Sequence, residues 1–203
     1  MPYYTRVFSK RPECPSYDEL VAVLRAKHPK VVLSVDGDDD NPWSSLELSH
    51  DDGEEIAVIE RNPVAPESLG EAEVSEFLED IQDCKPASAV AWLTSFLGSV
   101  KAVYAFQHLS GSDRDGGSEA LRAVSEFIWS QGDAILQADG EGFSNEDGYH
   151  ILWQFSDSVD GPWWMAVLRD GTWVRFQMDL GNLEQRRAFF EGRIPPDATL
   201  AEE

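Results

Sequence analysis

The stretch Tyr149–Leu180, YHILWQFSDSVDGPWWMAVLRDGTWVRFQMDL, carries the strongest strand pattern of the chain and four of its seven tryptophans. Tyr149–Phe155 places a Tyr, an Ile, a Trp and a Phe at every second position, which indicates a strand with one buried face. Trp163–Arg169 is apolar almost throughout, which is typical of a strand in the middle of a sheet. The stretch therefore predicts the aromatic strands around which a sheet is built.

The pair Asp170-Gly171 separates two β-rich runs and predicts a two-residue type I′ turn, in which both central residues have positive φ. This turn fixes the register of a hairpin. The expected pairs are Arg169 with Thr172, Leu168 with Trp173, Val167 with Val174, Met165 with Phe176 and Trp164 with Gln177. One face of the hairpin then carries only apolar side chains and is expected in the core.

The opposite face of this hairpin carries Trp164, Trp173, Arg175 and Gln177, with Ala166 and Leu168 between them. One interpretation is that another part of the protein covers the face and that Arg175 reaches past it to water. The other is a recognition face, since Trp and Arg are enriched at binding hot spots. We therefore name Trp164, Trp173, Arg175 and Gln177 as candidate binding residues.

The order of the predicted elements repeats along the chain. Each half reads as a strand, a helix, several strands and a helix, and short matches such as Leu33–Asp38 with Leu136–Glu141 support a repeat. We expect an α+β fold of two tandem β-α-β-β-β-α type repeats with mainly antiparallel sheets, packed as a pseudo-dimer. The expected repeats are residues 1–99 and 100–196, forming one compact body, followed by an acidic tail at 197–203.

The chain is strongly and evenly acidic. Its 203 residues include 16 basic and 38 acidic side chains, a formal charge of −22, and the excess is similar in both halves. Nucleic acid and anionic membranes would repel such a protein, so we expect neither as a partner. A basic protein or a cation fits better.

The first residues contain no apolar segment of a signal peptide, and no apolar run approaches the length of a membrane helix. Cys14 and Cys84 lie far apart, in no metal or redox spacing. These observations predict a soluble cytoplasmic protein with two reduced thiols.

Two acidic loops are candidate cation sites. Asp36, Asp38, Asp39 and Asp40 place four carboxylates in one loop, the ligand type that Ca²⁺ prefers, but without EF-hand spacing. The segment Asp113–Gly116 with Glu119 has a shorter acidic pattern, which is also typical of a turn that leads into a helix. A solvated loop is the alternative for both, so Ca²⁺ is the one cofactor that we weigh.

No catalytic motif is present. The four histidines, His28, His50, His108 and His150, lie in no metal-binding spacing, and nothing in the sequence pairs them with a nucleophile. The chain lacks a phosphate-binding loop, a dinucleotide fingerprint and a nucleophile elbow. Glu141 with Asp139 or Asp157 is the one carboxylate pair that could act as acid and base. These absences favour a protein that is not an enzyme and leave catalysis open.

The sequence thus favours a non-catalytic acidic interaction protein, of the inhibitor, immunity or adaptor type, that binds a basic protein without a cofactor. One alternative is a binder or hydrolase of small molecules or carbohydrates with a cleft between the repeats. Another is a calcium-modulated module that uses the loop at Asp36–Asp40.

Overall fold

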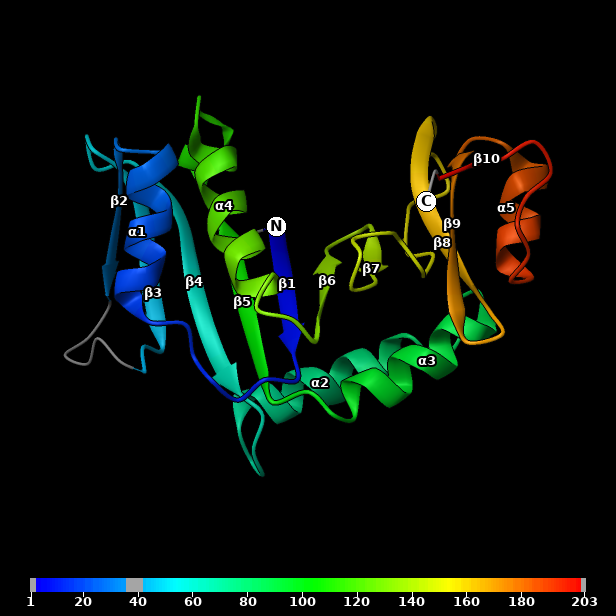
Figure 1. The fold of residues 1–203 in the computed structure, drawn as a ribbon, viewed down its shortest axis with the longest axis horizontal. Coiled ribbons are helices and arrows are strands. Elements are labelled where there is room, and N and C mark those ends of the chain that lie inside the picture. Colours follow the sequence, from blue (N-terminus) through cyan, green and yellow to red (C-terminus); the bar gives the residue numbers. More distant parts are fainter. Residues whose placement is uncertain (1–2, 36–41, 202–203) are drawn as a thin grey trace. The chain divides into compact units, whose positions relative to one another are not determined.

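The computed structural model describes residues 3–35 and 42–201, which form two compact units. Unit 1 consists of residues up to Glu71 together with Val100–Ala134, and unit 2 of Ala72–Ser99 together with residues from Ile135 onward. The protein is α+β with mostly antiparallel sheets, as the sequence predicts (Figure 1). Each unit takes segments from both halves of the chain, so the units differ from the expected division at residue 99. The tandem repeat stays a prediction.

Unit 1 is a five-stranded antiparallel arrangement in the order β2-β3-β4-β5-β1. Two helices, α1 and α4, contact each other, and α4 also contacts β1 and β4. The largest buried side chains come from the strands and from a tryptophan that precedes β3. The bounds are β1 Tyr3–Ser9, α1 Tyr17–Lys27, β2 Val31–Val35, β3 Ser45–His50, β4 Glu55–Pro63, β5 Ala102–His108 and α4 Gly117–Trp129.

The start of α1 follows directly from its sequence. The Ser16 hydroxyl accepts a hydrogen bond from the Glu19 N–H, and the Glu19 carboxylate accepts one from the Ser16 N–H. This reciprocal pair is a capping box, and it satisfies two amides that have no partner within the helix. The predicted helix start is confirmed.

Unit 2 contains a three-stranded sheet in the order β10-β9-β8 and a short β6–β7 hairpin, together with helices α3 and α5. Helix α2, Leu69–Asp80, begins in unit 1 and continues into unit 2. The other bounds are α3 Ala87–Leu97, β6 Ala134–Ala138, β7 Gly142–Ser144, β8 Pro162–Arg169, β9 Thr172–Asp179, α5 Leu183–Phe190 and β10 Thr199–Leu200.

The β8–β9 hairpin has the predicted turn and register. Asp170 and Gly171 have φ angles of 49° and 80°, and all five expected pairs are present. The face expected in the core lies in a cluster with Phe189 of α5, in which Met165, Val167 and Phe176 are completely buried. The local prediction is confirmed because a two-residue turn determines every pair that follows it.

The prediction of a strand at Tyr149–Phe155 is wrong. The segment makes only isolated bridges, because its amides bond to three different places: His150 N–H to Trp164 O, Ile151 N–H to Phe143 O and Trp153 N–H to Lys85 O. No single neighbouring strand supplies these acceptors, so no ladder forms. Leu152, expected on the polar face, is completely buried, and the alternation therefore does not describe two faces of a strand.

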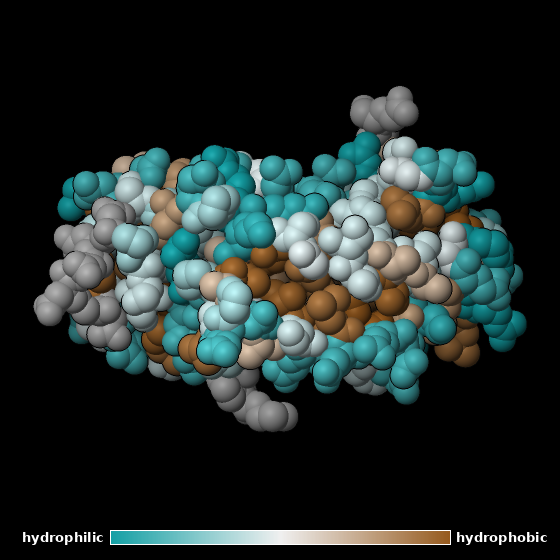
Figure 2. All heavy atoms as spheres, turned by 90° about the horizontal axis from the view of Figure 1, so that it is seen from below, coloured by the Kyte–Doolittle hydropathy of each residue, from teal (hydrophilic) through white to brown (hydrophobic). Residues whose placement is uncertain are grey.

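Hydrophobic residues reach the surface on the side where α2 and α3 lie (Figure 2). Helix α3 is mainly apolar, yet its exposed apolar residues are the small Ala87 and Ala91. The large hydrophobic side chains exposed in the described ranges are Tyr3, Val32, Leu69, Trp164, Leu183 and Leu200. In the ranges 3–35 and 42–201, no helix has both the length and the apolar composition to cross a membrane.

Candidate functional site

The outer face of the β8–β9 hairpin is divided into a covered and an exposed part. Trp173 is half-buried, and its ring meets the Trp92 ring of α3 edge-on with centroids 5.1 Å apart. Trp92 in turn stacks on Phe96 of the same helix. Trp164 lies on the same outer face and is 41% exposed, whereas Ala166 beside it is completely buried. Helix α3 therefore covers the end of the face that carries Trp173.

The other part, which we call the Trp164 face, consists of the exposed Trp164 and the half-buried Tyr149, Arg175 and Gln177. The Tyr149 ring meets Trp164 edge-on at 6.0 Å, and the Arg175 guanidinium lies 5.5 Å above the Tyr149 ring. Gln177 pairs with Trp164 on one side and with Thr199 of β10 on the other. Three of the four predicted binding residues thus lie together, and Trp173 lies apart against α3.

Tyr149 is a member of this face that the sequence analysis placed elsewhere. It reaches Trp164 because the next residue, His150, is bonded to β8 through its main chain. The His150 N–H donates to Trp164 O at 3.2 Å, and the Ala166 N–H donates to His150 O at 2.8 Å. These two bonds make an isolated parallel bridge between His150 and Met165 of β8. No short-range pattern could indicate this pairing, since the two segments are joined by a loop.

The His150 side chain lies in a polar and aromatic cluster. Its Nδ1 atom accepts a hydrogen bond from the Trp163 indole N–H at 3.0 Å, and its Nε2 atom lies 3.7 Å from Glu141 Oε2. The ring also packs against Phe155. A donor at Nδ1 places the proton of the neutral ring on Nε2, facing the carboxylate. The cluster therefore orients His150 and, through the chain, Tyr149.

Ser144, His150 and Glu141 have the composition of a hydrolytic triad, but their arrangement does not support nucleophilic catalysis. Ser144 Oγ lies 3.3 Å from His150 Nδ1, the atom that already accepts the shorter bond from Trp163. A general base needs a free lone pair directed at the nucleophile. Ser144 is also only 5% exposed, so a substrate has little access to its hydroxyl. We interpret the cluster as structural.

A tight turn with two exposed carboxylates directly precedes Tyr149. Asn145 is completely buried, and its Oδ1 atom accepts hydrogen bonds from the Asp147 and Tyr149 N–H groups at 3.2 and 2.9 Å. The Gly148 N–H donates to Asn145 O and closes the turn. Glu146 and Asp147 are exposed at its tip, immediately before Tyr149. The buried amide thus fixes where these two charges are displayed.

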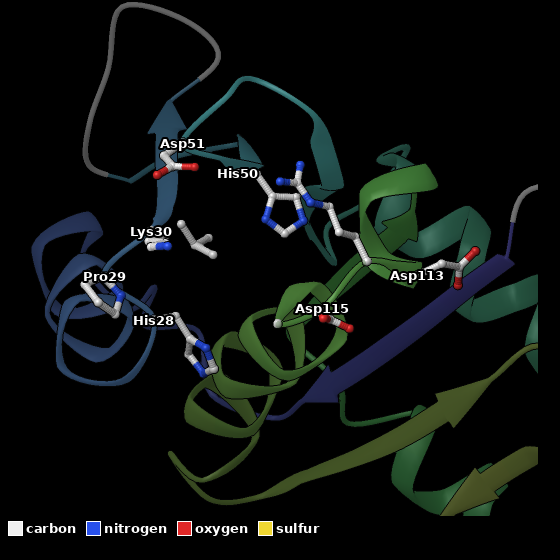
Figure 3. Close-up of a pocket in the computed structure, with 10 residues that line it drawn as sticks. His28, Pro29, Lys30, His50, Asp51, Asp113 and Asp115 are labelled. Carbon is white, nitrogen blue, oxygen red and sulfur yellow. The ribbon is translucent and has the colours of Figure 1, made fainter.

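Unit 1 contains an open cavity of about 690 Å³ into which two of the four histidines project (Figure 3). His28 ends α1 and leads to Lys30, which precedes β2, whereas His50 ends β3 and leads to Asp51. These segments meet because β2 pairs with β3, and the Asp51 N–H donates to Lys30 O. The loop Asp113–Gly116 before α4 forms the opposite wall.

This loop is attached firmly to the β3–β4 hairpin. Arg114 Nη1 lies 2.6 Å from Asp52 Oδ2 and 3.1 Å from Glu54 Oε2. The hydrogen bond from Arg114, with a smaller contribution from the Glu54 N–H, lowers the pKa of Asp52. The His50 Nε2–H donates to Gly111 O at 3.0 Å. The positive charge of Arg114 is therefore already matched by two carboxylates.

The remaining site predictions concern a metal ion and the histidine at the end of β5. The proposed calcium ligands Asp36, Asp38, Asp39 and Asp40 lie outside the described residues, so this prediction stays untested. Within the ranges 3–35 and 42–201, no group of three or more His, Cys, Asp or Glu side chains is arranged to hold a metal ion. His108 lies near Thr5 and Tyr3, with its Nε2 atom 3.2 Å from the Thr5 hydroxyl.

Comparison with known proteins adds no assignment. No protein-family model matches the chain, and neither a curated protein nor a solved structure matches it.

Proposed function

We propose that the protein is a non-catalytic acidic binding protein, of the inhibitor or adaptor type, that recognises a basic protein through the Trp164 face. The observation that carries the proposal is the exposure of Trp164, 41%, in a strand whose neighbouring residues Met165, Ala166 and Val167 are completely buried. An exposed indole that is held by packed neighbours can bury a large area on binding with little loss of side-chain freedom.

The charge of unit 2 supports a basic partner. Unit 2 contains 18 acidic and 6 basic residues. One of the basic residues, Arg186, is only 9% exposed and donates to the carbonyl oxygens of Leu180, Asp157 and Val159. Its charge therefore does little to balance the carboxylates at the surface. An excess of surface carboxylates attracts a basic protein and increases its association rate.

The face itself offers complementary contacts. The π face of an exposed indole attracts Lys and Arg side chains, an interaction of about 0.5–2 kcal/mol. Glu146 and Asp147 are exposed in the turn that precedes Tyr149 in the chain, and they add negative charge to this part of unit 2. The guanidinium of Arg175 already lies over the Tyr149 ring, so Trp164 is the aromatic residue of the face that remains for a partner.

A capture experiment tests this proposal. Immobilised wild type and the Trp164→Ala and Leu183→Ala variants are incubated with lysate of the source organism, and the captured proteins are identified by mass spectrometry. Leu183 is a matched control because it is a large hydrophobic residue of unit 2 that is 73% exposed. We expect a basic protein that wild type and Leu183→Ala retain and that Trp164→Ala loses.

The captured protein is then purified and its affinity for each variant is measured. Truncation of a binding hot spot costs about 2 kcal/mol, so Trp164→Ala should weaken binding by about thirtyfold, and salt should weaken binding to all variants. Equal affinity of Trp164→Ala and wild type would place the binding site elsewhere. Capture of acidic proteins only, insensitive to salt, would refute the electrostatic argument.

A further inference from the structure

We propose that the cavity of unit 1 is a binding site for a small organic cation, an ammonium or guanidinium group that donates N–H hydrogen bonds. The cavity lies wholly within unit 1 and shares no residue with the Trp164 face, so the inference does not depend on the proposed function.

The lining of the cavity carries more negative than positive side chains. Asp51, Asp113 and Asp115 contribute three carboxylates, and Lys30 and Arg114 contribute two cations. Arg114 forms ion pairs with Asp52 and Glu54, which do not line the cavity, so its charge is already balanced. Lys30 remains as the one lining cation without an ion pair among the described residues. The lining is therefore net negative toward a ligand, which disfavours an anion and favours a cation.

His50 supplies the second observation, which is independent of the acidic side chains. The ring is 7% exposed, and its Nε2 atom is 3.0 Å from Gly111 O. A carbonyl oxygen can only accept, so Nε2 carries the proton, and in the neutral ring Nδ1 is left with a lone pair. No group in the described ranges bonds to Nδ1, and the atom is not one of the buried side-chain atoms that lack a partner there, so it is accessible from the cavity.

This lone pair is available to a ligand. Figure 3 shows the edge of the His50 ring that carries its nitrogen atoms turned toward the interior of the pocket, with Asp51 on one side. An ammonium or guanidinium group can donate one hydrogen bond to Nδ1 and others to carboxylates, whereas a cation without N–H groups cannot. The ligand class follows from this combination of an acceptor and net negative charge.

The wall that holds His50 in place is rigid. A Cβ atom on Gly111 would lie 2.6 Å from Glu55 O, and one on Gly117 would lie 2.1 Å from Gly111 O. The main chains of the loop, the hairpin and α4 are thus in direct contact at two successive points. His50 and Asp51 are consequently positioned before a ligand arrives, which reduces the entropy cost of binding.

The binding test uses two probes of known chemistry. Agmatine carries a guanidinium and an ammonium group, and tetramethylammonium carries the same type of charge without N–H groups. Each is titrated into the full-length protein at constant ionic strength while the backbone amides and the ¹⁵N signals of His50 are followed by NMR. We expect saturable shifts at His50, Asp51 and Asp115 with agmatine, and a shift of Nδ1 that tetramethylammonium does not cause.

Four variants make the test specific. His50→Gln keeps an N–H donor for Gly111 O but moves the acceptor: when the amide nitrogen replaces Nε2, the amide oxygen extends from the position of Cδ2 and not from that of Nδ1. Agmatine binding should therefore fall at least tenfold while the fold is retained. Asp51→Asn should weaken binding about threefold, and Lys30→Met should strengthen it about threefold, since a competing cation is removed. Asp133→Asn, at an exposed carboxylate of unit 1 outside the cavity lining, should have no effect.

Several outcomes would overturn the proposal. Equal shifts with agmatine and tetramethylammonium would indicate diffuse attraction to an acidic surface. Unchanged affinity in His50→Gln would show that Nδ1 does not accept from the ligand, and weaker binding in Lys30→Met would reverse the assumed charge balance. An absence of saturable shifts up to tens of millimolar agmatine would also refute the site. None of these results depends on Trp164.

Discussion

Gly117→Ala tests the packing that fixes the loop between η1, Ser110–Asp113, and α4. An added Cβ atom at this position would lie 2.1 Å from Gly111 O and 3.1 Å from the Cα atom of Ser112. Since an ordinary contact begins at about 3.4 Å, the helix and the loop would have to separate by roughly 1.3 Å. Gly111 cannot move back freely, because its main chain lies so close to β4 that a Cβ atom on it would be 2.6 Å from Glu55 O.

Two contributions to the free energy of unfolding oppose each other in this variant. Alanine restricts the unfolded chain and suits a helix better than glycine, which stabilises by about 0.5–1 kcal/mol. Overpacking against main-chain atoms destabilises by about 1–3 kcal/mol. The second is larger, so we expect a net destabilisation of about 1–2 kcal/mol. The sign of the measured change in the free energy of unfolding therefore shows which of the two contributions is larger.

The assay is native-state hydrogen exchange of the amides of β3, β4 and β5, combined with urea unfolding. Exchange is needed because the chain forms two units, and a single two-state transition cannot be assumed for both. Ser118→Ala, at the next and exposed residue of α4, is the control and should stay within about 0.5 kcal/mol of wild type. A Gly117→Ala protein as stable as wild type, or more stable, would refute the reasoning.

Four further predictions concern single side chains. Arg186→Met should destabilise unit 2 by about 3 kcal/mol, because one buried and two part-buried carbonyl groups lose their donor; a loss below about 1 kcal/mol in urea unfolding would contradict this. Trp153→Ala should cost about 3–5 kcal/mol in the same assay, and a much smaller cost would place its ring outside the core. Gly171→Val should cost about 1–2 kcal/mol, since a β-branched residue resists a φ of 80°, and unchanged thermal stability would argue against the type I′ turn. Arg114→Gln should raise the pKa of Asp52 toward its ordinary value, measured by carboxyl NMR titration; an unchanged titration would show that the Arg114 hydrogen bond does not lower it.

The parts of the fold that the sequence predicts are those with local causes. The capping box at Ser16 and the type I′ turn at Gly171 each depend on a few adjacent residues, and both are confirmed. The segment Tyr149–Phe155 was predicted wrongly because its hydrogen bonds go to separate places, including Lys85 before α3. Periodicity describes the side chains of a segment and contains no information on which main-chain groups will meet it.

The same limit applies to the candidate sites. The register placed Trp164 and Trp173 on one face of the hairpin, but only the contact of Trp173 with Trp92 determines which tryptophan is covered. His50 had no partner in the sequence because Gly111, which binds its Nε2 atom, lies 61 residues away. The short distance between these residues results from loop packing that local propensity does not encode.

The basic residues of unit 2 explain how an acidic unit can have an unbalanced surface. Arg186 donates hydrogen bonds to main-chain carbonyl oxygens, and its guanidinium lies 4.9 Å over the Trp153 ring inside the unit. Arg175 lies over Tyr149, and Arg193 is paired with its neighbour Glu191. A buried cation held by carbonyl groups stabilises the fold without neutralising an exposed carboxylate. Removing positive charge from the surface in this way leaves exposed acids such as Glu146 and Asp147 available to a partner that supplies the missing charge.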